Sequence, residues 1–168
     1  MKKEKFTTKK LVMSALFAAI ACIATIIIKI PSPIGGYINL GDGIILLCGW
    51  FLSPAYCFLA AGIGSALADL FSGYIIYAPI TFFVKGIMAL IAHFVFNKLK
   101  TKPLITKIIS AISAEFFMIL GYFIFEGIIY GFVPSLTNIP ANAVQGIAGI
   151  TLAIILVDKI KVITEKYN

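Results

Sequence analysis

Residues 62–93 have the sequence GIGSALADLFSGYIIYAPITFFVKGIMALIAH, which contains the clearest signal of the fold. It holds two long apolar runs separated by a Ser-Gly break, with Pro79 near the start of the second run. About 20 apolar residues are enough to span a bilayer as a helix. Each run carries an ionisable side chain, Asp69 in the first and Lys85 in the second. Such residues are costly inside a membrane and indicate functional sites.

The rest of the chain has the same character. Hydrophobic residues make up 61% of its 168 residues and charged residues only 12%, and its mean hydropathy is +1.04. Soluble domains are about half apolar and a quarter charged, so this composition favours the bilayer as solvent. The apolar runs are continuous rather than alternating, which disfavours a membrane β-barrel. We therefore expect an all-α membrane protein, one domain over residues 1–168, with no room for a soluble catalytic domain.

Six transmembrane helices are expected from these runs and from the Pro, Gly and charged residues between them. Their expected ranges are Thr8–Ile28, Gly43–Leu52, Ala55–Phe71, Pro79–Phe96, Ile108–Tyr130 and Ala141–Ile160. The second is short for a span, because about ten residues cover only half of the hydrocarbon core. The basic start and first apolar run resemble a signal peptide, but they lack a small-residue cleavage site, so a retained helix is expected.

The lysines predict the orientation. The net charge of +7 comes from lysines that cluster at helix ends and in one loop, Asn97–Lys107. With six helices and the N-terminus inside, the cytoplasmic lysines are Lys2, Lys3, Lys5, Lys9, Lys10, Lys98, Lys100, Lys102, Lys107, Lys159, Lys161 and Lys166. Cytoplasmic segments of membrane proteins are enriched in Lys and Arg, so both termini are expected in the cytoplasm. This distribution also argues against nucleic-acid binding.

Most polar groups within the apolar runs fall in the outer half of the expected bundle. They are Asp42, Asp69, Lys85, Glu126, Asn142 and Gln145. Asn142 and Gln145 are three residues apart and so share a helix face. A pocket reached from outside and lined by these groups would suit a small polar ligand, with tyrosines as aromatic surface. Alternatively, Lys85 forms a structural ion pair with Asp69 or Glu126, and the tyrosines form an interfacial belt. Trp50 falls near the inner face in this topology and is assigned to such a belt.

Glu115 and His93 lie deeper, toward the cytoplasmic side. They could form a proton relay, or they could be satisfied by ordinary packing and hydrogen bonds. The sequence has no GxxxxGK[ST] loop, no HExxH and no CxxC pair, and these are motifs of nucleotide and metal sites. We therefore expect no enzyme activity, no cofactor and no metal site in this chain.

Small residues recur every four positions in the first helix. Ala15 and Ala19 form one such pair, and Ser14, Ala18 and Cys22 form a second series. This spacing lets helix backbones approach closely in lipid. The face could pack within the bundle or dock another membrane protein, whereas the small residues at 61–68 are expected to pack within the bundle.

The stretch Gly36–His93 resembles the substrate-binding (S) components of energy-coupling factor (ECF) transporters, the vitamin importers of bacteria. The resemblance lies in GYINLGDGIILLCGWFLSP (residues 36–54) and in the 62–93 sequence above. It points to the branch assigned to riboflavin, pyridoxine or hydroxymethylpyrimidine. Beyond Lys98 the resemblance is one of topology alone.

The resemblance implies a subunit of the bacterial cell membrane that captures a vitamin from outside and delivers it with a transmembrane coupling (T) subunit and two ATPases. ATP would be used by those partners and not by this chain. Ala15 and Ala19 match the AxxxA pattern by which S components are thought to dock on the coupling subunit. The implied ligand-binding residues are Asn39, Asp42, Asp69, Tyr74, Tyr77, Lys85, Glu126, Asn142 and Gln145.

For the ligand, pyridoxine or hydroxymethylpyrimidine is the first choice and riboflavin the second. The alternative function is a self-sufficient proton-coupled carrier or channel that uses Glu115 and His93.

Overall fold

The computed structural model describes residues 7–166. Its elements are α1 (Thr8–Ile27), β1 (Ile30–Pro31), β2 (Tyr37–Ile38), α2 (Gly41–Phe51), α3 (Pro54–Phe71), α4 (Ala78–Lys98), α5 (Pro103–Tyr130), α6 (Phe132–Ser135), the 3-10 helix η1 (Leu136–Asn138) and α7 (Ile139–Lys166). The helical architecture agrees with the sequence prediction. Lys2, Lys3 and Lys5, which support the predicted orientation, lie outside the described residues.

Five segments of the described chain are long and apolar enough to cross a membrane: α1, α3, α4, α5 and the segment that runs from α6 through α7. The remaining helix, α2, has 11 residues, which is about 16 Å at 1.5 Å per residue. All of its residues from Gly41 to Trp50 are buried. α2 is therefore a short central helix enclosed by the others, where the sequence pattern predicts a sixth span.

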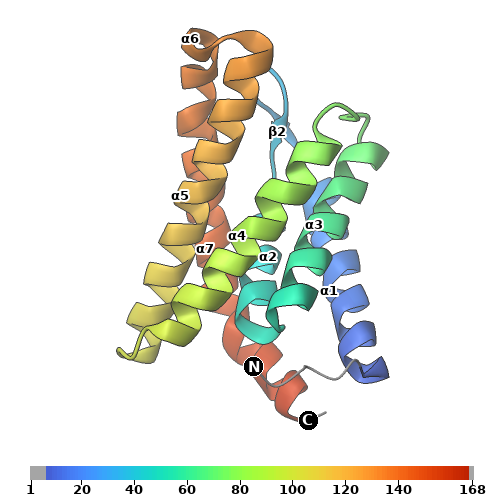
Figure 1. Ribbon diagram of the computed structural model, residues 1–168, viewed down its shortest axis with the longest axis vertical. Helices are drawn as coiled ribbons and strands as arrows, with labels where there is room; N and C mark the ends of the chain where they lie inside the picture. The colour runs from blue at the N-terminus through green and yellow to red at the C-terminus, as the bar shows by residue number, and fades with distance from the viewer. Residues whose placement is uncertain (1–6, 167–168) are drawn as a thin grey trace.

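The elements surround α2, which packs against α1, α3, α4 and α7. The antiparallel β1–β2 hairpin, in which Ile30 pairs with Ile38, lies at the same end of the bundle as the α3–α4 turn and α6. We call this the hairpin end (Figure 1). The start of α1 and the last turns of α7 both lie at the opposite end. This arrangement is the one expected of six alternating segments, and the side of the membrane that each end faces stays a prediction.

The helix boundaries differ most from the prediction around the basic loop. α5 begins at Pro103 rather than Ile108, and Pro is favoured in the first turn because its missing N–H needs no partner there. The loop expected over Asn97–Lys107 is therefore reduced to residues 99–102. At the other end, the loop expected over Gly131–Pro140 contains α6 and η1.

Trp50 is buried rather than part of an interfacial belt, so that assignment is wrong. Its side chain is 8% exposed, its indole N–H donates to Ser110 Oγ at 2.9 Å, and its ring packs on Phe96. The reason is the shortness of α2, whose last turn ends among α4 and α5 instead of at a membrane surface.

Small residues let the helices approach closely, as expected for the 61–68 segment. A Cβ atom on Gly64 of α3 would lie 2.4 Å from the carbonyl oxygen of Ala18 in α1. A Cβ on Gly49 of α2 would lie 2.6 Å from the carbonyl oxygen of Ala89 in α4. Neither contact leaves room for a side chain, so these glycines determine how closely the backbones pack.

We predict that Gly64→Leu destabilises the protein by about 1–3 kcal/mol, because the new side chain must displace backbone rather than a flexible side chain. Thermal unfolding in detergent, followed by Trp50 fluorescence, measures the effect. Leu70→Ala is the control, since Leu70 lies on α3 but is 47% exposed. Equal unfolding temperatures for Gly64→Leu and Leu70→Ala would contradict the close α1–α3 contact.

Candidate ligand-binding site

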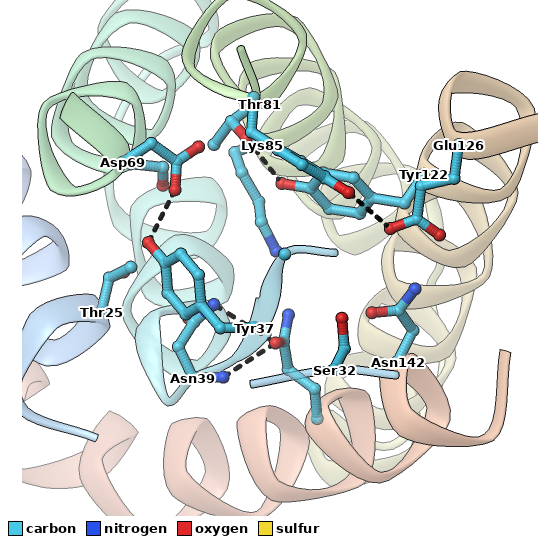
Figure 2. Close-up of a pocket in the computed structure, with 14 residues that line it drawn as sticks. Thr25, Ser32, Tyr37, Asn39, Asp69, Thr81, Lys85, Tyr122, Glu126 and Asn142 are labelled. Carbon is cyan, nitrogen blue, oxygen red and sulfur yellow. Dashed lines mark hydrogen bonds between the residues drawn. The ribbon is translucent and has the colours of Figure 1, made fainter. Parts of the chain in front are cut away.

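A polar cavity lies between the hairpin and the adjacent halves of the long helices (Figure 2). With the side chains in these positions it has about 30 Å³ of space, enough for one or two water molecules, so a larger ligand requires the hairpin or the lining side chains to move. The residues that line it are Thr25, Ser32, Gly36, Tyr37, Asn39, Ser65, Asp69, Tyr77, Thr81, Lys85, Tyr122, Glu126, Asn142 and Gln145. Most of these side chains are polar, in contrast to the apolar exterior of the bundle.

Four helices each contribute two polar side chains to the cavity, three or four residues apart in sequence. The pairs are Ser65 and Asp69 on α3, Thr81 and Lys85 on α4, Tyr122 and Glu126 on α5, and Asn142 and Gln145 on α7. Residues at these spacings lie on one face of a helix. The cavity is thus formed by four polar helix faces that turn toward one another.

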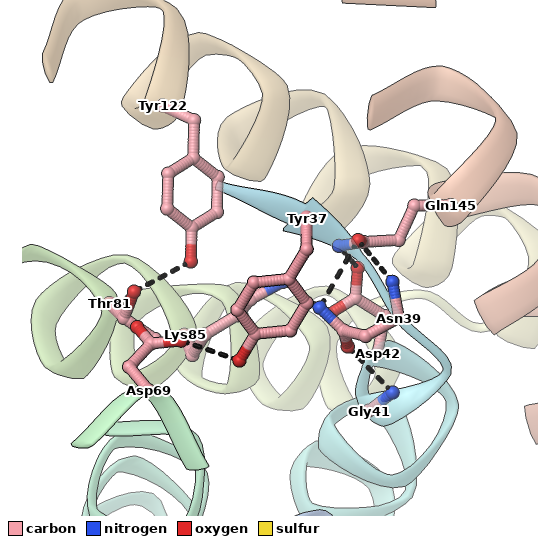
Figure 3. A network of polar contacts seen from close by, with 9 residues as sticks. All are labelled: Tyr37, Asn39, Gly41, Asp42, Asp69, Thr81, Lys85, Tyr122 and Gln145. Carbon is pink, nitrogen blue, oxygen red and sulfur yellow. Dashed lines mark hydrogen bonds and ion pairs between the residues drawn. The ribbon is translucent and has the colours of Figure 1, made fainter. Parts of the chain in front are cut away.

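A buried network centred on Asp42 connects three helices and the hairpin (Figure 3). Asp42 Oδ1 forms an ion pair with Lys85 Nζ, and Asp42 Oδ2 accepts a hydrogen bond from Gln145 Nε2 at 2.7 Å. Gln145 Oε1 accepts from the backbone N–H of Asn39 at 2.9 Å and from Asn39 Nδ2 at 3.2 Å. Asn39 Oδ1 in turn accepts from the N–H of Gly41 at 2.9 Å, at the start of α2.

This network identifies the partner of Lys85 as Asp42. The predicted pairing of Lys85 with Asp69 or Glu126 is therefore wrong, although Lys85 does form a buried ion pair. Side chains of Asp42 and Lys85 are 0% and 3% exposed. A buried charge is tolerated only when it is paired and hydrogen-bonded, and both conditions are met here.

Asp69 is held by the hairpin. Tyr37 Oη donates to Asp69 Oδ1 at 2.6 Å, and the rings of Tyr37 and Tyr74 lie 4.6 Å apart between centroids. Burial, and secondly the nearby carboxylate of Asp69, raise the pKa of Tyr37. Tyr37 therefore remains a hydrogen-bond donor at neutral pH.

Glu126 forms a third group of contacts, next to the tip of the hairpin. Its Oε1 accepts from Asn138 Nδ2 at 3.0 Å and from Tyr77 Oη at 3.4 Å. Asn138 Nδ2 also donates to the carbonyl oxygen of Gly35 at 3.2 Å. Gly35 has φ +146°, and a Cβ atom there would lie 2.8 Å from Tyr77 Oη. The absence of a side chain at Gly35 lets the hairpin lie directly on this group.

Glu115 and His93 lie away from the cavity lining and in different surroundings. Glu115 is 3% exposed and lies against two glycines of α7. A Cβ atom on Gly146 would be 3.1 Å from its Oε2, and a Cβ atom on Gly149 would be 3.0 Å from its Oε1. His93 Nδ1 is 3.0 Å from the carbonyl oxygen of Gly49. Neither residue hydrogen-bonds to the other among the described residues.

Seven of the nine predicted ligand-binding residues line the cavity: Asn39, Asp69, Tyr77, Lys85, Glu126, Asn142 and Gln145. The other two are outside the lining. Asp42 lies behind it, where it holds Lys85 and Gln145, and Tyr74 packs on Tyr37. Contact of any of these residues with a ligand stays a prediction.

Sequence reasoning missed Thr25, Ser32, Gly36, Ser65 and Thr81 in the lining. A signal existed for two of them, because Ser65 precedes Asp69 by four residues and Thr81 precedes Lys85 by four. Ser32 and Gly36 reach the cavity through the hairpin, which no periodic pattern indicates.

Ala15 and Ala19 are exposed and line an apolar groove between α1 and α3. The groove also includes Ala18, which contacts Gly64. The small-residue face of α1 therefore does two things: one edge packs within the bundle, and the edge with Ala15 and Ala19 remains uncovered.

Comparison with known proteins agrees with this architecture. A family model for the S component of ECF-type riboflavin transporters matches residues 5–162. The fold is similar to one described as "Structure and mechanism of the S component of a bacterial ECF transporter", with a TM-score of 0.76, 22% sequence identity, and coverage of 93% of this chain and 97% of that one. A Pyrococcus woesei protein described as "Uncharacterized protein in gap 3'region" is 32% identical over 131 residues, 77% of this chain and 86% of its own length.

The family model defines the class of protein, a substrate-binding subunit of a membrane transporter. The chain belongs to the family of S components of ECF-type riboflavin transporters. The resemblance found in the sequence is thereby confirmed at the level of the family. Members of this family bind substrate for a transporter, which agrees with the expectation that the chain is not an enzyme.

We predict that Lys85→Met costs about 3–5 kcal/mol of stability, because it leaves the buried Asp42 carboxylate without its cation. The double variant Asp42→Asn/Lys85→Met should recover most of this loss, since the Asn side chain keeps an oxygen for Gln145. Unfolding in detergent measures both.

Asp69→Asn/Lys85→Met is the control. The stability losses of the single variants Asp69→Asn and Lys85→Met should add to within about 0.5 kcal/mol in this double variant, as expected of residues that do not interact directly. If stability recovers in Asp69→Asn/Lys85→Met and not in Asp42→Asn/Lys85→Met, the assigned ion pair is contradicted.

Proposed function

We propose that this chain is the vitamin-capturing subunit of an ECF-type importer in a bacterial cell membrane, with both termini in the cytoplasm. The ligand enters the cavity from outside, at the hairpin end. The observation that carries the proposal is the cavity itself, where polar faces of four helices converge inside an otherwise apolar bundle. Polar groups at membrane depth are expensive and are kept where they bind a substrate or ion.

The hairpin supplies the entry to the cavity. Its residues Ser32, Gly36 and Tyr37 line the cavity, and its contacts to the helices include the hydrogen bonds Tyr37–Asp69 and Asn138–Gly35. Only a few hydrogen bonds must break for the hairpin to move away. A ligand that satisfied the same groups would hold the hairpin closed.

For the ligand we propose a single-ring heterocycle, such as pyridoxine or hydroxymethylpyrimidine. The lining includes both tyrosine rings and amide and carboxyl groups, which suits a flat ring with hydrogen-bonding substituents. Riboflavin is the second candidate, and the family model that matches the chain favours it.

Release into the cell requires partners in this proposal. They are a transmembrane coupling subunit and two ATPases, because the chain has no nucleotide-binding loop of its own. The uncovered groove with Ala15 and Ala19 is the proposed docking surface for the coupling subunit, since small residues let another helix approach closely.

The alternative, a self-sufficient proton-coupled carrier, uses Glu115 and His93. It has less support, because these residues are apart from the cavity lining and from each other. The two functions differ in one requirement: the carrier transports alone, and the S component needs its partners.

We predict that Asn142→Leu lowers vitamin affinity about 10-fold or more, since a ligand group that pairs with the amide loses that hydrogen bond in a buried site. Isothermal titration of the purified chain without ATP measures this. Val144→Ala is the control, because Val144 is close in sequence but 59% exposed. Unchanged affinity in Asn142→Leu would remove this residue from the site.

We predict that Ala15→Trp and Ala19→Trp abolish co-purification with the coupling subunit and ATPases, and also vitamin uptake into vesicles, while vitamin binding stays unchanged. Ile20→Trp is the matched control, because Ile20 is 40% exposed on the same helix and does not line the groove. Uptake by vesicles that contain this chain alone, driven by a pH gradient, would instead support the carrier.

A further inference from the structure

Acidic side chains outnumber basic ones in the interior that the structure describes. Among residues 7–162, four carboxyl side chains are buried, those of Asp42, Asp69, Glu115 and Glu126, and each is at most 5% exposed. Within the same residues Lys85 is the one buried cation. Lys85 and Asp42 form an ion pair with each other. The carboxyl groups on the cavity wall therefore have no cation to balance them.

Asp69 and Glu126 occupy this position on the wall (Figure 2). Their assigned partners are neutral donors: Tyr37 for Asp69, and Asn138 and Tyr77 for Glu126. Hydrogen bonds from neutral groups reduce the cost of burying a carboxylate, but they do not cancel its charge.

Each of the two carboxyl groups also has an oxygen without a hydrogen bond. Asp69 Oδ2 and Glu126 Oε2 are shielded from solvent and have no donor within hydrogen-bond geometry among the described residues. Buried polar atoms in folded proteins nearly always have a partner, and an acceptor that lacks one is costly. Since both residues line the cavity, a ligand in the cavity can supply the missing donors.

Lys85 is not placed to hold an anionic ligand. Lys85 is the cationic side chain in the cavity lining and could otherwise bind a phosphate or carboxylate. Its ammonium group, however, already pairs with Asp42. It also lies 5.4 Å from the centroid of the Tyr122 ring. An anion in the cavity would face Asp69 and Glu126 without a cation of its own.

We infer that the cavity selects a ligand with a positively charged or protonated nitrogen, whose N–H groups pair with Asp69 and Glu126, and that it discriminates against anionic ligands. Charge-assisted hydrogen bonds to carboxylates are about twice as strong as neutral ones. Rings of Tyr37 and Tyr77 in the lining can stabilise such a cation further through cation–π contact. This inference rests on the proposed function and narrows its substrate class to a small cationic heterocyclic amine, which ranks a cation such as pyridoxamine ahead of neutral pyridoxine.

The test uses ligands that differ in charge at one position. Pyridoxamine, pyridoxine and 4-pyridoxate share one ring and carry an aminomethyl, a hydroxymethyl and a carboxylate group at the same carbon. Thiamine adds a second cation and riboflavin a second neutral ligand. Affinities for the purified chain are measured by isothermal titration. The tightest ligand should be a cation, and pyridoxamine should bind at least about 10-fold more tightly than 4-pyridoxate, the gain expected of one charge-assisted bond.

Glu126→Gln and Asp69→Asn should each reduce the preference for cations about 10-fold, because they keep the shape of the side chain and remove its charge. Asp158→Asn is the control, since it changes the net charge equally at a side chain that is 84% exposed at the opposite end. Unfolding temperatures establish that the variants are folded. If one variant does not fold, the other variant and the ligand series still test the inference.

Two different failures can be told apart. If riboflavin or another neutral or anionic ligand binds most tightly, or if the preference for cations survives in both variants, this inference is wrong and the proposed function stands. If no member of the panel binds, the proposed function itself is contradicted, and the inference fails with it.

Discussion

The buried ion pair between Asp42 and Lys85 organises the half of this molecule next to the hairpin. A membrane offers little hydrophobic drive for one helix to bind another, because lipid tails are as apolar as the side chains they would replace. Polar contacts and close backbone packing must therefore provide the specificity. Neither charge of this pair can be left alone without a cost of several kcal/mol, so α2 and α4 must meet at this point. Gln145 extends the contact to α7, and Asn39 extends it to the hairpin.

The short helix α2 is possible because of the same network. A helix end inside a membrane protein must have its backbone groups satisfied by protein. The N–H of Gly41 at the start of α2 is bonded by Asn39, and the N–H of Leu52 after its end is bonded by the carbonyl oxygen of Cys48. Enclosed on all sides, α2 fills the centre of the bundle, and the space beyond its N-terminal end becomes the cavity. The exterior stays apolar, the cavity is polar, and the α1–α3 groove with Ala15 and Ala19 remains uncovered.

The sequence predicts the long helices well, because continuous apolar runs and first-turn prolines are local signals. It also predicts the polar groups of the cavity, since Asp69, Lys85 and Glu126 stand out in apolar surroundings. It does not predict which charges pair, because Asp42 and Lys85 are 43 residues apart and several partners were equally available. Nor does it predict the hairpin, whose two-residue strands are too short for a periodic pattern. The sequence does not predict the burial of Trp50 for a related reason: the apolar run of α2 looks like a complete span, which would place its end at the membrane surface.

Native mass spectrometry of the chain, purified from a cell membrane without added ligand, tests most directly whether one small polar molecule occupies the cavity. We expect one water-soluble ligand per chain, identified by its mass after release, and we expect it to be lost when Asn142 is replaced by a bulkier apolar residue. Chains that carry only lipids, or a ligand retained when the cavity is filled in this way, would contradict this expectation.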